Sequence, residues 1–169
     1  MGPMASGLTY SRKVSSAEAM KQLAATLAPY VHPGDVIVLS GDLGAGKTQF
    51  TQGLAAALGV REAVCSPTFN ILLTYPEARV PLYHFDLYRL DSEAQLEDIA
   101  FYETVDGDGV SLVEWGDRFP DAMPYNYLDV CIVVNEDGSR TVRVRSAGDR
   151  ARQLLYVWAN DSKSRLVKC

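Results

Sequence analysis

The sequence predicts an α/β fold of three layers around a mixed, mostly parallel central sheet. Three adjoining segments carry this prediction: a β-branched apolar run at 35–40, a glycine-rich loop at 41–48, and a run of helix formers at 48–58 that stops at Gly59. An apolar strand that passes through glycines directly into a helix is typical of a parallel sheet covered by helices. The chain has 169 residues, 47% hydrophobic and 22% charged, so we expect one globular domain over residues 9–169.

The first eight residues are set apart from this domain. Met1-Gly2-Pro3-Met4 resembles a remnant of cloning ahead of a second methionine, so we expect residues 1–8 to be disordered or foreign to the fold. They lack the basic and then apolar layout of a signal peptide, and no later run is apolar enough to span a membrane. We therefore expect a cytoplasmic protein without a membrane segment.

Hydrophobic periodicity predicts the other elements in chain order. Ser15-Ser16-Ala17-Glu18 has the spacing of a capping box, and apolar residues at helical spacing follow it as far as Leu27, which predicts a first helix. Runs of β-branched and aromatic residues predict further strands at 70–74, 80–85, 110–113, 128–134 and 141–145. Asp137-Gly138 is expected to join the last two as a hairpin. Helices are expected at 90–102 and 147–158, so the domain should begin and end in a helix.

Charge and cysteine content argue against two classes of function. The formal net charge is -5 and no stretch strings together four or more lysines and arginines, which disfavours binding of RNA or DNA by this chain alone. Its three cysteines, Cys65, Cys131 and Cys169, share no CxxC spacing and have only two histidines as possible co-ligands. We expect reduced thiols rather than a zinc site or a set of disulfides.

The loop Gly41-Asp42-Leu43-Gly44-Ala45-Gly46-Lys47-Thr48 carries the strongest chemical signal. A triphosphate concentrates negative charge, so a loop that binds it must bring backbone N–H groups close, and glycines allow this because they have no Cβ. In this pattern Lys47 contacts the β- and γ-phosphates, and the Thr48 hydroxyl is a magnesium ligand. The strand before and the helix after are the context that the Walker A motif requires. The sequence therefore predicts a P-loop NTPase-like domain that binds ATP and Mg²⁺.

A magnesium ion at this loop needs a further oxygen ligand, which an acid at the end of a neighbouring strand supplies in such folds. Asp86 follows the strand at 80–85 and Glu114 follows that at 110–113, so both are candidates, and the spacing alone does not choose between them. His84 is expected to be structural, because a lone histidine on an alternating strand is more often packed than catalytic. Trp115 either stacks near a nucleotide or fills core volume.

Four motifs occur together, in this order: the loop at 41–48, Ser66-Pro67-Thr68-Phe69, His84-Phe85-Asp86-Leu87-Tyr88-Arg89, and Val113-Glu114-Trp115. This set, which runs from about the first helix to the last, resembles the TsaE (YjeE) family. Members of that family are small bacterial ATPases that act with TsaB and TsaD to make threonylcarbamoyladenosine beside the anticodon of certain transfer RNAs. The resemblance implies the same role here, with tRNA contacted only indirectly, through the complex.

The resemblance also implies roles for individual residues. Lys47 resembles the family's phosphate-binding lysine, and Thr48 and Glu114 resemble its magnesium ligands. Asp86 resembles an acid needed for hydrolysis, which favours Glu114 over Asp86 as the direct ligand. Trp115 resembles a tryptophan beside the nucleotide.

A second group of positions is less regular. Ser66-Pro67-Thr68 resembles a switch-like loop in which the Thr68 hydroxyl senses the γ-phosphate. Gln49 stands where many members have threonine. The expected catalytic groups are Lys47, Asp86 and Glu114, and the expected nucleotide site comprises Gly41, Asp42, Leu43, Gly44, Ala45, Gly46, Lys47, Thr48, Gln49, Thr68 and Trp115. For adenine, only the segment before Glu18 and the Ser146-Ala147-Gly148 turn are candidates.

Hydrolysis by the chain alone is expected to be slow, with ATP use resetting the TsaB–TsaD machine. Arg89 is the nearest candidate for an arginine finger, and an ion pair with a neighbouring acid is its alternative role. Two rival functions stay open. A small-molecule kinase of the P-loop class would need an acceptor pocket and an arginine-bearing lid, whereas an interaction protein would leave Lys47 and Thr48 idle. A regulatory GTPase is disfavoured, because the chain has no Asn-Lys-x-Asp segment.

Overall fold

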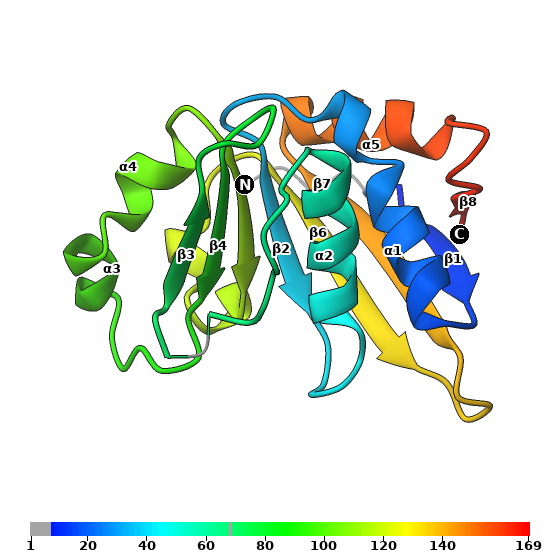
Figure 1. Ribbon diagram of the computed structural model, residues 1–169, viewed down its shortest axis with the longest axis horizontal. Helices are drawn as coiled ribbons and strands as arrows, with labels where there is room; N and C mark the ends of the chain where they lie inside the picture. Colours follow the sequence, from blue (N-terminus) through cyan, green and yellow to red (C-terminus); the bar gives the residue numbers. More distant parts are fainter. Residues whose placement is uncertain (1–7, 68) are drawn as a thin grey trace.

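Figure 1 shows the computed structural model, which describes residues 8–67 and 69–169. Over these residues an eight-stranded sheet has the order β3-β4-β5-β2-β6-β7-β1-β8. The strands are β1 Tyr10–Val14, β2 Val36–Ser40, β3 Leu72–Tyr75, β4 Leu82–Asp86, β5 Val110–Glu114, β6 Tyr127–Val134, β7 Arg140–Ala147 and β8 Val167–Lys168. The helices are α1 Ala17–Ala25, α2 Lys47–Ala57, α3 Ala94–Asp98, α4 Phe101–Val105 and α5 Asp149–Ala159, with short 3-10 turns η1 Ala28–Tyr30, η2 Gly116–Arg118 and η3 Pro120–Ala122.

The sheet is parallel at its centre and antiparallel on both sides. β4, β5, β2 and β6 pair in parallel, whereas β3 is antiparallel to β4, and β7, β1 and β8 continue antiparallel beyond β6. β2 lies between β5 and β6, so the chain leaves β2 toward one side of the sheet and later returns to the other. Such a switch in strand order opens a crevice at the carboxyl ends of the strands. The predicted α/β fold with a mixed sheet is confirmed, and its parallel pairs are the central ones.

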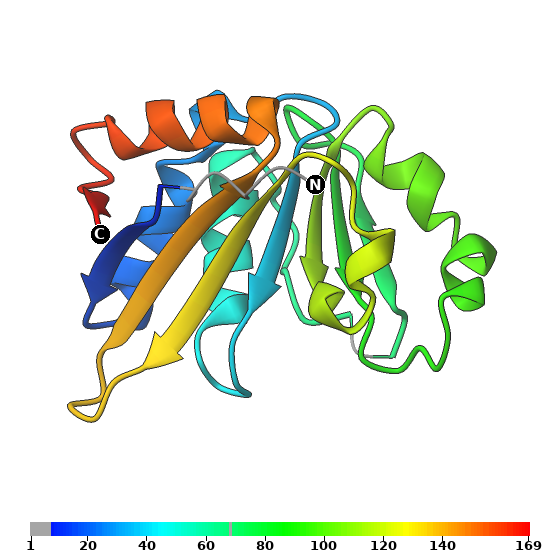
Figure 2. The ribbon, with the colours of Figure 1, turned by 180° about the vertical axis from the view of Figure 1, so that it is seen from behind.

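Alternate residues of the central strands face two separate cores, which creates the three layers. Ile37 and Leu39 belong to the core that contains α1, α2 and α5. Val36 and Val38 belong to a second core on the opposite face, formed with α3, α4 and the segment after β5. Figure 1 shows α1 and α2 in front of the sheet, and Figure 2 shows that, among the described residues, no helix covers β6 and β7 from behind.

A close helix–helix contact holds the helix that follows the glycine loop. Gly53, in the middle of α2, packs against α1 so tightly that a Cβ at this position would lie 2.2 Å from the Lys21 carbonyl oxygen. Phe50 and Leu54 of the same helix are fully buried in the first core. The position of α2, and with it the end of the glycine loop, is therefore fixed by backbone contact as well as by apolar burial.

The expectation that the domain begins and ends in a helix is wrong, because β1 precedes α1 and β8 follows α5. β1 has the sequence Tyr-Ser-Arg-Lys-Val and buries only Val14, and β8 has two exposed residues. Strands of this kind, at or next to the edge of a sheet, have no alternation of apolar residues for a sequence pattern to detect. They form because β7 and then β1 offer unpaired backbone groups.

Two helix predictions also need correction. The cap of α1 is Ser16, whose Oγ accepts a hydrogen bond from the Ala19 N–H at 3.0 Å, and not Ser15 as the capping-box spacing suggested. The helix expected at 90–102 is divided into α3 and α4, because Ala100 between them adopts a left-handed backbone with φ 54°. Of the described helices, none is long and apolar enough to cross a lipid bilayer. Apart from Leu8, the segment 1–8 that was set aside lies outside the described residues.

Candidate functional site

The glycine loop joins the carboxyl end of β2 to the start of α2. Gly41, Gly44 and Gly46 all have positive φ angles, of 150°, 80° and 120°. At Gly41 a Cβ would also lie 2.7 Å from the Ile132 carbonyl oxygen on β6, so only glycine fits there. Leu43 at the tip is 99% exposed, whereas Ala45 of the same loop is fully buried in the first core. The tip is therefore shaped by backbone conformations that glycine allows, and the second half of the loop also packs through Ala45.

Arg140, at the start of β7, braces this loop from the neighbouring hairpin. Its Nε donates to the Ala45 carbonyl at 3.0 Å and its Nη2 to the Gly44 carbonyl at 3.3 Å. Its Nη1 donates to Gly138 in the hairpin turn. Because these three carbonyls belong to two different loops, one guanidinium fixes the distance between the glycine loop and the hairpin. The sequence analysis missed Arg140, and its 95-residue separation from Ala45 leaves no local pattern that would reveal it.

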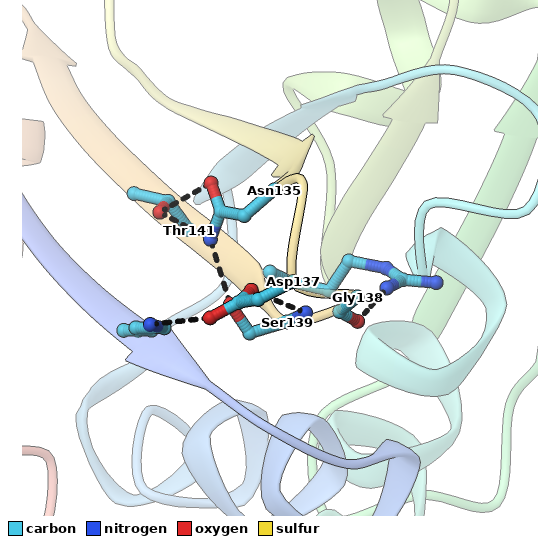
Figure 3. Close-up of polar contacts among 7 residues, drawn as sticks. Asn135, Asp137, Gly138, Ser139 and Thr141 are labelled. Carbon is cyan, nitrogen blue, oxygen red and sulfur yellow. Dashed lines mark hydrogen bonds and ion pairs between the residues drawn. The ribbon is translucent and has the colours of Figure 1, made fainter.

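The hairpin that carries Arg140 is itself tied to β1, as Figure 3 shows. Asp137 accepts hydrogen bonds from Lys13 Nζ at 2.8 Å and from the Ser139 N–H at 3.0 Å. At the base of the turn the Asn135 side-chain amide donates to the hydroxyl groups of Ser139 and Thr141. Hydrogen bonds from Lys13 and from Ser139 lower the pKa of the Asp137 carboxyl. The turn predicted at Asp137-Gly138 is confirmed. It is bonded to β1 through Lys13 on one side and to the glycine loop through Arg140 on the other.

The candidate acids lie side by side at the carboxyl ends of two parallel strands. β4 and β5 pair in register, with Asp86 directly opposite Glu114. Both are buried, with exposed fractions of 6% and 4%. Asp86 Oδ1 accepts a hydrogen bond from the Tyr88 N–H at 3.0 Å. Strand register therefore brings together the two residues that their spacing had left as alternatives.

Glu114 connects the glycine loop to β4. Its Oε1 lies 3.8 Å from Lys47 Nζ, and its Oε2 lies 2.7 Å from Nε2 of His84. Lys47 also lies over the Trp115 ring, 4.7 Å from its centroid. Trp115 has a left-handed backbone with φ 64°, which is unfavourable for a residue with a Cβ. Lysine, glutamate and tryptophan thus form one compact cluster beneath the loop.

The electrostatics of the two acids differ. Burial raises the pKa of the Asp86 carboxyl above its ordinary value, and the negative charge of Glu114 adds to the rise. The Tyr88 N–H, His84 and Lys47 oppose it. Asp86 thus holds a proton more readily than a surface aspartate does, which is a property of carboxyl groups that handle protons in catalysis.

Other expected residues lie around this cluster. Thr48 and Gln49 are half-buried in the first turn of α2, directly after Lys47. Asp42 of the loop is exposed, whereas Ala45 of the same loop is buried. Thr68 lies outside the described residues. Arg89 does not form the ion pair considered for it with any described acid; its guanidinium lies over the Phe69 ring at 4.5 Å.

Cavities flank the loop on two sides. One of about 340 Å³ is lined by Gly41, Lys47, Trp115 and residues at the end of β6. A second of about 240 Å³ is lined by Ser15, Ser16 and Met20, by the loop, and by Arg140. The turn at 146–148 is not near either, because Ala147 pairs with Tyr127 at the opposite end of β6. Of the two segments considered for an adenine, only the one before Glu18 therefore adjoins the loop.

This arrangement has defined chemical capacities. Backbone N–H groups at the start of α2 and the ammonium of Lys47 favour a phosphate. Thr48 and Glu114 supply oxygens of the kind that Mg²⁺ prefers. The described residues include no cluster of three or more histidine, cysteine or acidic side chains placed for a metal. Magnesium that is shared with nucleotide phosphates commonly has only one or two protein ligands, so the donor set fits such a shared ion.

Comparison with known proteins identifies the family. The model of the family described as "Threonylcarbamoyl adenosine biosynthesis protein TsaE" matches residues 14–142, a stretch that contains the loop, both acids and the hairpin. The chain belongs to the TsaE family. The resemblance seen in the sequence motifs is therefore confirmed, and the chain is involved in tRNA threonylcarbamoyladenosine biosynthesis.

Individual relatives agree with this assignment. The tRNA threonylcarbamoyladenosine biosynthesis protein TsaE of Bacillus subtilis is 41% identical over 137 residues, which cover 81% of this chain and 85% of that protein. The protein of the same description from Treponema pallidum is 44% identical over 111 residues, 66% of this chain and 82% of that one. A crystal structure of Bacillus subtilis YdiB superposes with a TM-score of 0.77 at 33% identity, covering 89% of this chain and 94% of that one.

Proposed function

We propose that this chain is the ATP-binding and ATP-hydrolysing subunit of the tRNA threonylcarbamoyladenosine machinery and that it acts with TsaB and TsaD. One observation carries the proposal. A glycine loop with the Walker A pattern lies directly above a buried lysine–glutamate pair, and the glutamate is paired with an aspartate across two parallel strands. This combination supplies separate groups for phosphate, metal and water.

In this proposal Lys47 and the loop N–H groups bind the β- and γ-phosphates. The 3.8 Å separation between Lys47 Nζ and Glu114 is long for an ion pair, so the lysine is free to turn toward a phosphate. Thr48 and Glu114 hold Mg²⁺, which neutralises charge on the phosphates when bound. Trp115 supports the lysine from the other side through its ring face.

Asp86 orients the attacking water. The water oxygen forms a bond to the γ-phosphorus, the bond to the bridging oxygen breaks, and ADP leaves with the electron pair. The proton released by the water passes to Asp86 or to solvent. The raised pKa of the Asp86 carboxyl suits it to receive this proton.

Turnover by the chain alone is slow in this proposal. Arg89, the one arginine considered as a finger, stacks on Phe69 instead of meeting Lys47 or Glu114. A residue of TsaB or TsaD would complete the charge stabilisation, as partner arginines do in other nucleotide hydrolases. ATP hydrolysis then drives a conformational cycle of the complex. With a net charge of -5 the chain meets tRNA only through its partners, and it works in the cytoplasm, where tRNA is modified.

The test is ATP turnover by the purified chain, alone and with TsaB and TsaD. We expect turnover to rise with the partners and to fall at least about a hundredfold in Lys47→Ala. Lys47→Met keeps more of the packing against Trp115 and separates loss of charge from loss of folding. Lys168→Ala, an exposed lysine of β8, is the matched control and should be unchanged.

Three outcomes would overturn the proposal. Transfer of phosphate from ATP to a small metabolite, without any effect of the partners, would indicate a P-loop kinase. Absence of ATP binding would indicate an interaction protein with an idle loop. Equal turnover in wild type and Lys47→Met, with both folded, would place the chemistry at another site.

A further inference from the structure

The most unusual buried group outside the roles already assigned is His84 on β4. Its side chain is fully buried, with an exposed fraction of 0%. Nε2 lies 2.7 Å from Glu114 Oε2, whereas Nδ1 has no hydrogen-bond partner among the described residues. The ring therefore makes a single polar contact, and that contact is with the glutamate.

Packing alone does not account for a histidine here. Leu82, two residues earlier on the same face of β4, is also fully buried and apolar. Burying an imidazole with one unsatisfied nitrogen is unfavourable compared with an apolar side chain of similar size. A leucine at position 84 would fit the pattern of the strand. The histidine thus costs stability at this position, and among the described residues its one hydrogen bond is to Glu114.

The geometry divides the two oxygens of the Glu114 carboxylate. A carboxylate that binds a metal is ionised and only accepts hydrogen bonds, so in that state Nε2–H of His84 is the donor to Oε2. Oε1 is directed to the other side, where Lys47 Nζ lies at 3.8 Å. A glutamate side chain has three rotatable bonds, and a hydrogen bond to Oε2 restricts how far they rotate. One oxygen is consequently held by the strand and the other faces the glycine loop.

We propose that His84 is a positioning residue that holds Glu114 so that Oε1 alone is presented to the magnesium–nucleotide complex. This inference rests on the proposed function, since it assigns Glu114 as the magnesium ligand. It goes further by giving the fully buried histidine, which the sequence analysis treated as structural, a defined effect on metal binding. Partners that orient a metal-ligating carboxylate typically change metal affinity ten- to a hundredfold when removed, in order of magnitude.

The experiment measures how much Mg²⁺ tightens the binding of an ATP analogue with a non-hydrolysable β–γ bridge. Affinity is determined by calorimetry with Mg²⁺ and with a chelator, and the ratio of the two is compared among variants. His84→Leu should lower this ratio about ten- to a hundredfold. His84→Gln should restore most of it, because its amide N–H reaches about as far as imidazole Nε2.

The control is Leu82→Ala, which leaves a cavity on the same face of the same strand and should lower thermal stability without changing the ratio. The proposal is overturned if His84→Leu keeps the wild-type ratio, or if His84→Gln and His84→Leu lose it equally while both are folded. It is also overturned if Leu82→Ala lowers the ratio as much, because the effect would then come from general loosening of β4. A wild-type chain that binds no nucleotide would instead refute the proposed function.

Discussion

The candidate site has two sides, the glycine loop and the ends of β4 and β5, and different physical interactions hold their residues in place. On the loop side, Leu43 is 99% exposed, and the backbone is shaped by glycine angles and one brace from Arg140. On the strand side, Asp86 and Glu114 are buried and fixed by the register of β4 and β5. The loop side is therefore set by backbone conformation and one arginine, whereas the strand side is set by burial and strand register.

This difference implies different energetic costs. The strand side concentrates carboxyl groups away from water, which opposes their ionisation and lowers the stability of the fold. The loop side carries little buried polarity, and its cost lies in conformations that most residues do not adopt. Substitutions of the buried acids on the strand side should therefore lower activity and raise stability. Substitutions of the glycines on the loop side should lower both activity and stability.

The largest effect is expected for Asp86→Asn, which should lower ATP turnover at least about a hundredfold and raise the unfolding temperature at neutral pH. A carboxyl with a raised pKa in the folded chain binds its proton more tightly there than in the unfolded chain. Its ionisation therefore costs stability above the unfolded value of about 4. Asparagine has no charge to desolvate, and its amide oxygen still accepts from the Tyr88 N–H.

The pH dependence makes this prediction specific. The stability advantage of Asp86→Asn should be larger at neutral pH and should shrink as the pH falls toward 4, where wild-type Asp86 is protonated. Thermal unfolding at several pH values measures it. Asp106→Asn, at an exposed aspartate after α4, should change neither turnover nor stability. A destabilised Asp86→Asn would refute the idea that the strand side is built at a cost.

A smaller effect is expected for Gly41→Ala on the loop side. The added Cβ would meet the Ile132 carbonyl at 2.7 Å, and the φ of 150° is strained for alanine. Strain of about 1–3 kcal/mol corresponds to affinity for ATP about five- to 150-fold weaker, and stability should fall as well. Calorimetric titration and thermal unfolding measure the two quantities.

Gly59→Ala serves as the comparison for Gly41→Ala. Gly59 has a φ of 92° but no atom within 4 Å of an added Cβ, and it lies at the far end of α2. It should lose some stability and no affinity. Equal affinity losses in the two variants would mean that the loop has no special steric requirement at Gly41.

The smallest effect is expected for Arg140→Ala, which removes the hydrogen bonds from the hairpin to the Ala45 and Gly44 carbonyls. Arg140 makes three hydrogen bonds, and loss of the two to the loop carbonyls, at a partly exposed site, should weaken ATP binding about three- to tenfold. The weakening should be the same with and without Mg²⁺, unlike that expected for His84→Leu, because the brace touches only the loop carbonyls. Arg145→Ala, on the same strand but paired with Asp129, is the control. If Arg140→Ala weakened ATP binding only in the presence of Mg²⁺, the loop side and the strand side would not act independently.

The sequence predicted the parts of the site that are contiguous or that end a strand. The loop at 41–48 is a single motif in a fitting context, and Asp86 and Glu114 follow recognisable apolar runs. Two features left no such signal. The contact between His84 and Glu114 depends on which two strands are neighbours, and the contact of Arg140 with Ala45 joins residues 95 positions apart. Periodicity does not encode strand order.

The edges of the fold were missed for a related reason. β1 and β8 have mostly exposed or half-buried side chains, so their strand conformation comes from the partners available rather than from their own residues. The turn at 146–148 was one of two candidates for the adenine, but β7 carries it to the opposite end of the sheet from the glycine loop. A turn can be recognised locally, but its distance from another loop is set by topology.

The contact between Gly53 and Lys21 sets the distance between α1 and α2. α1 lines the cavity beside the loop through Met20, and α2 lines it through Gln49. Since a Cβ at position 53 would lie 2.2 Å from the Lys21 carbonyl, the two helices stand as close as their main chains allow. The width of that cavity is therefore a property of two backbones in contact, and exchange of surface side chains on either helix leaves it unchanged.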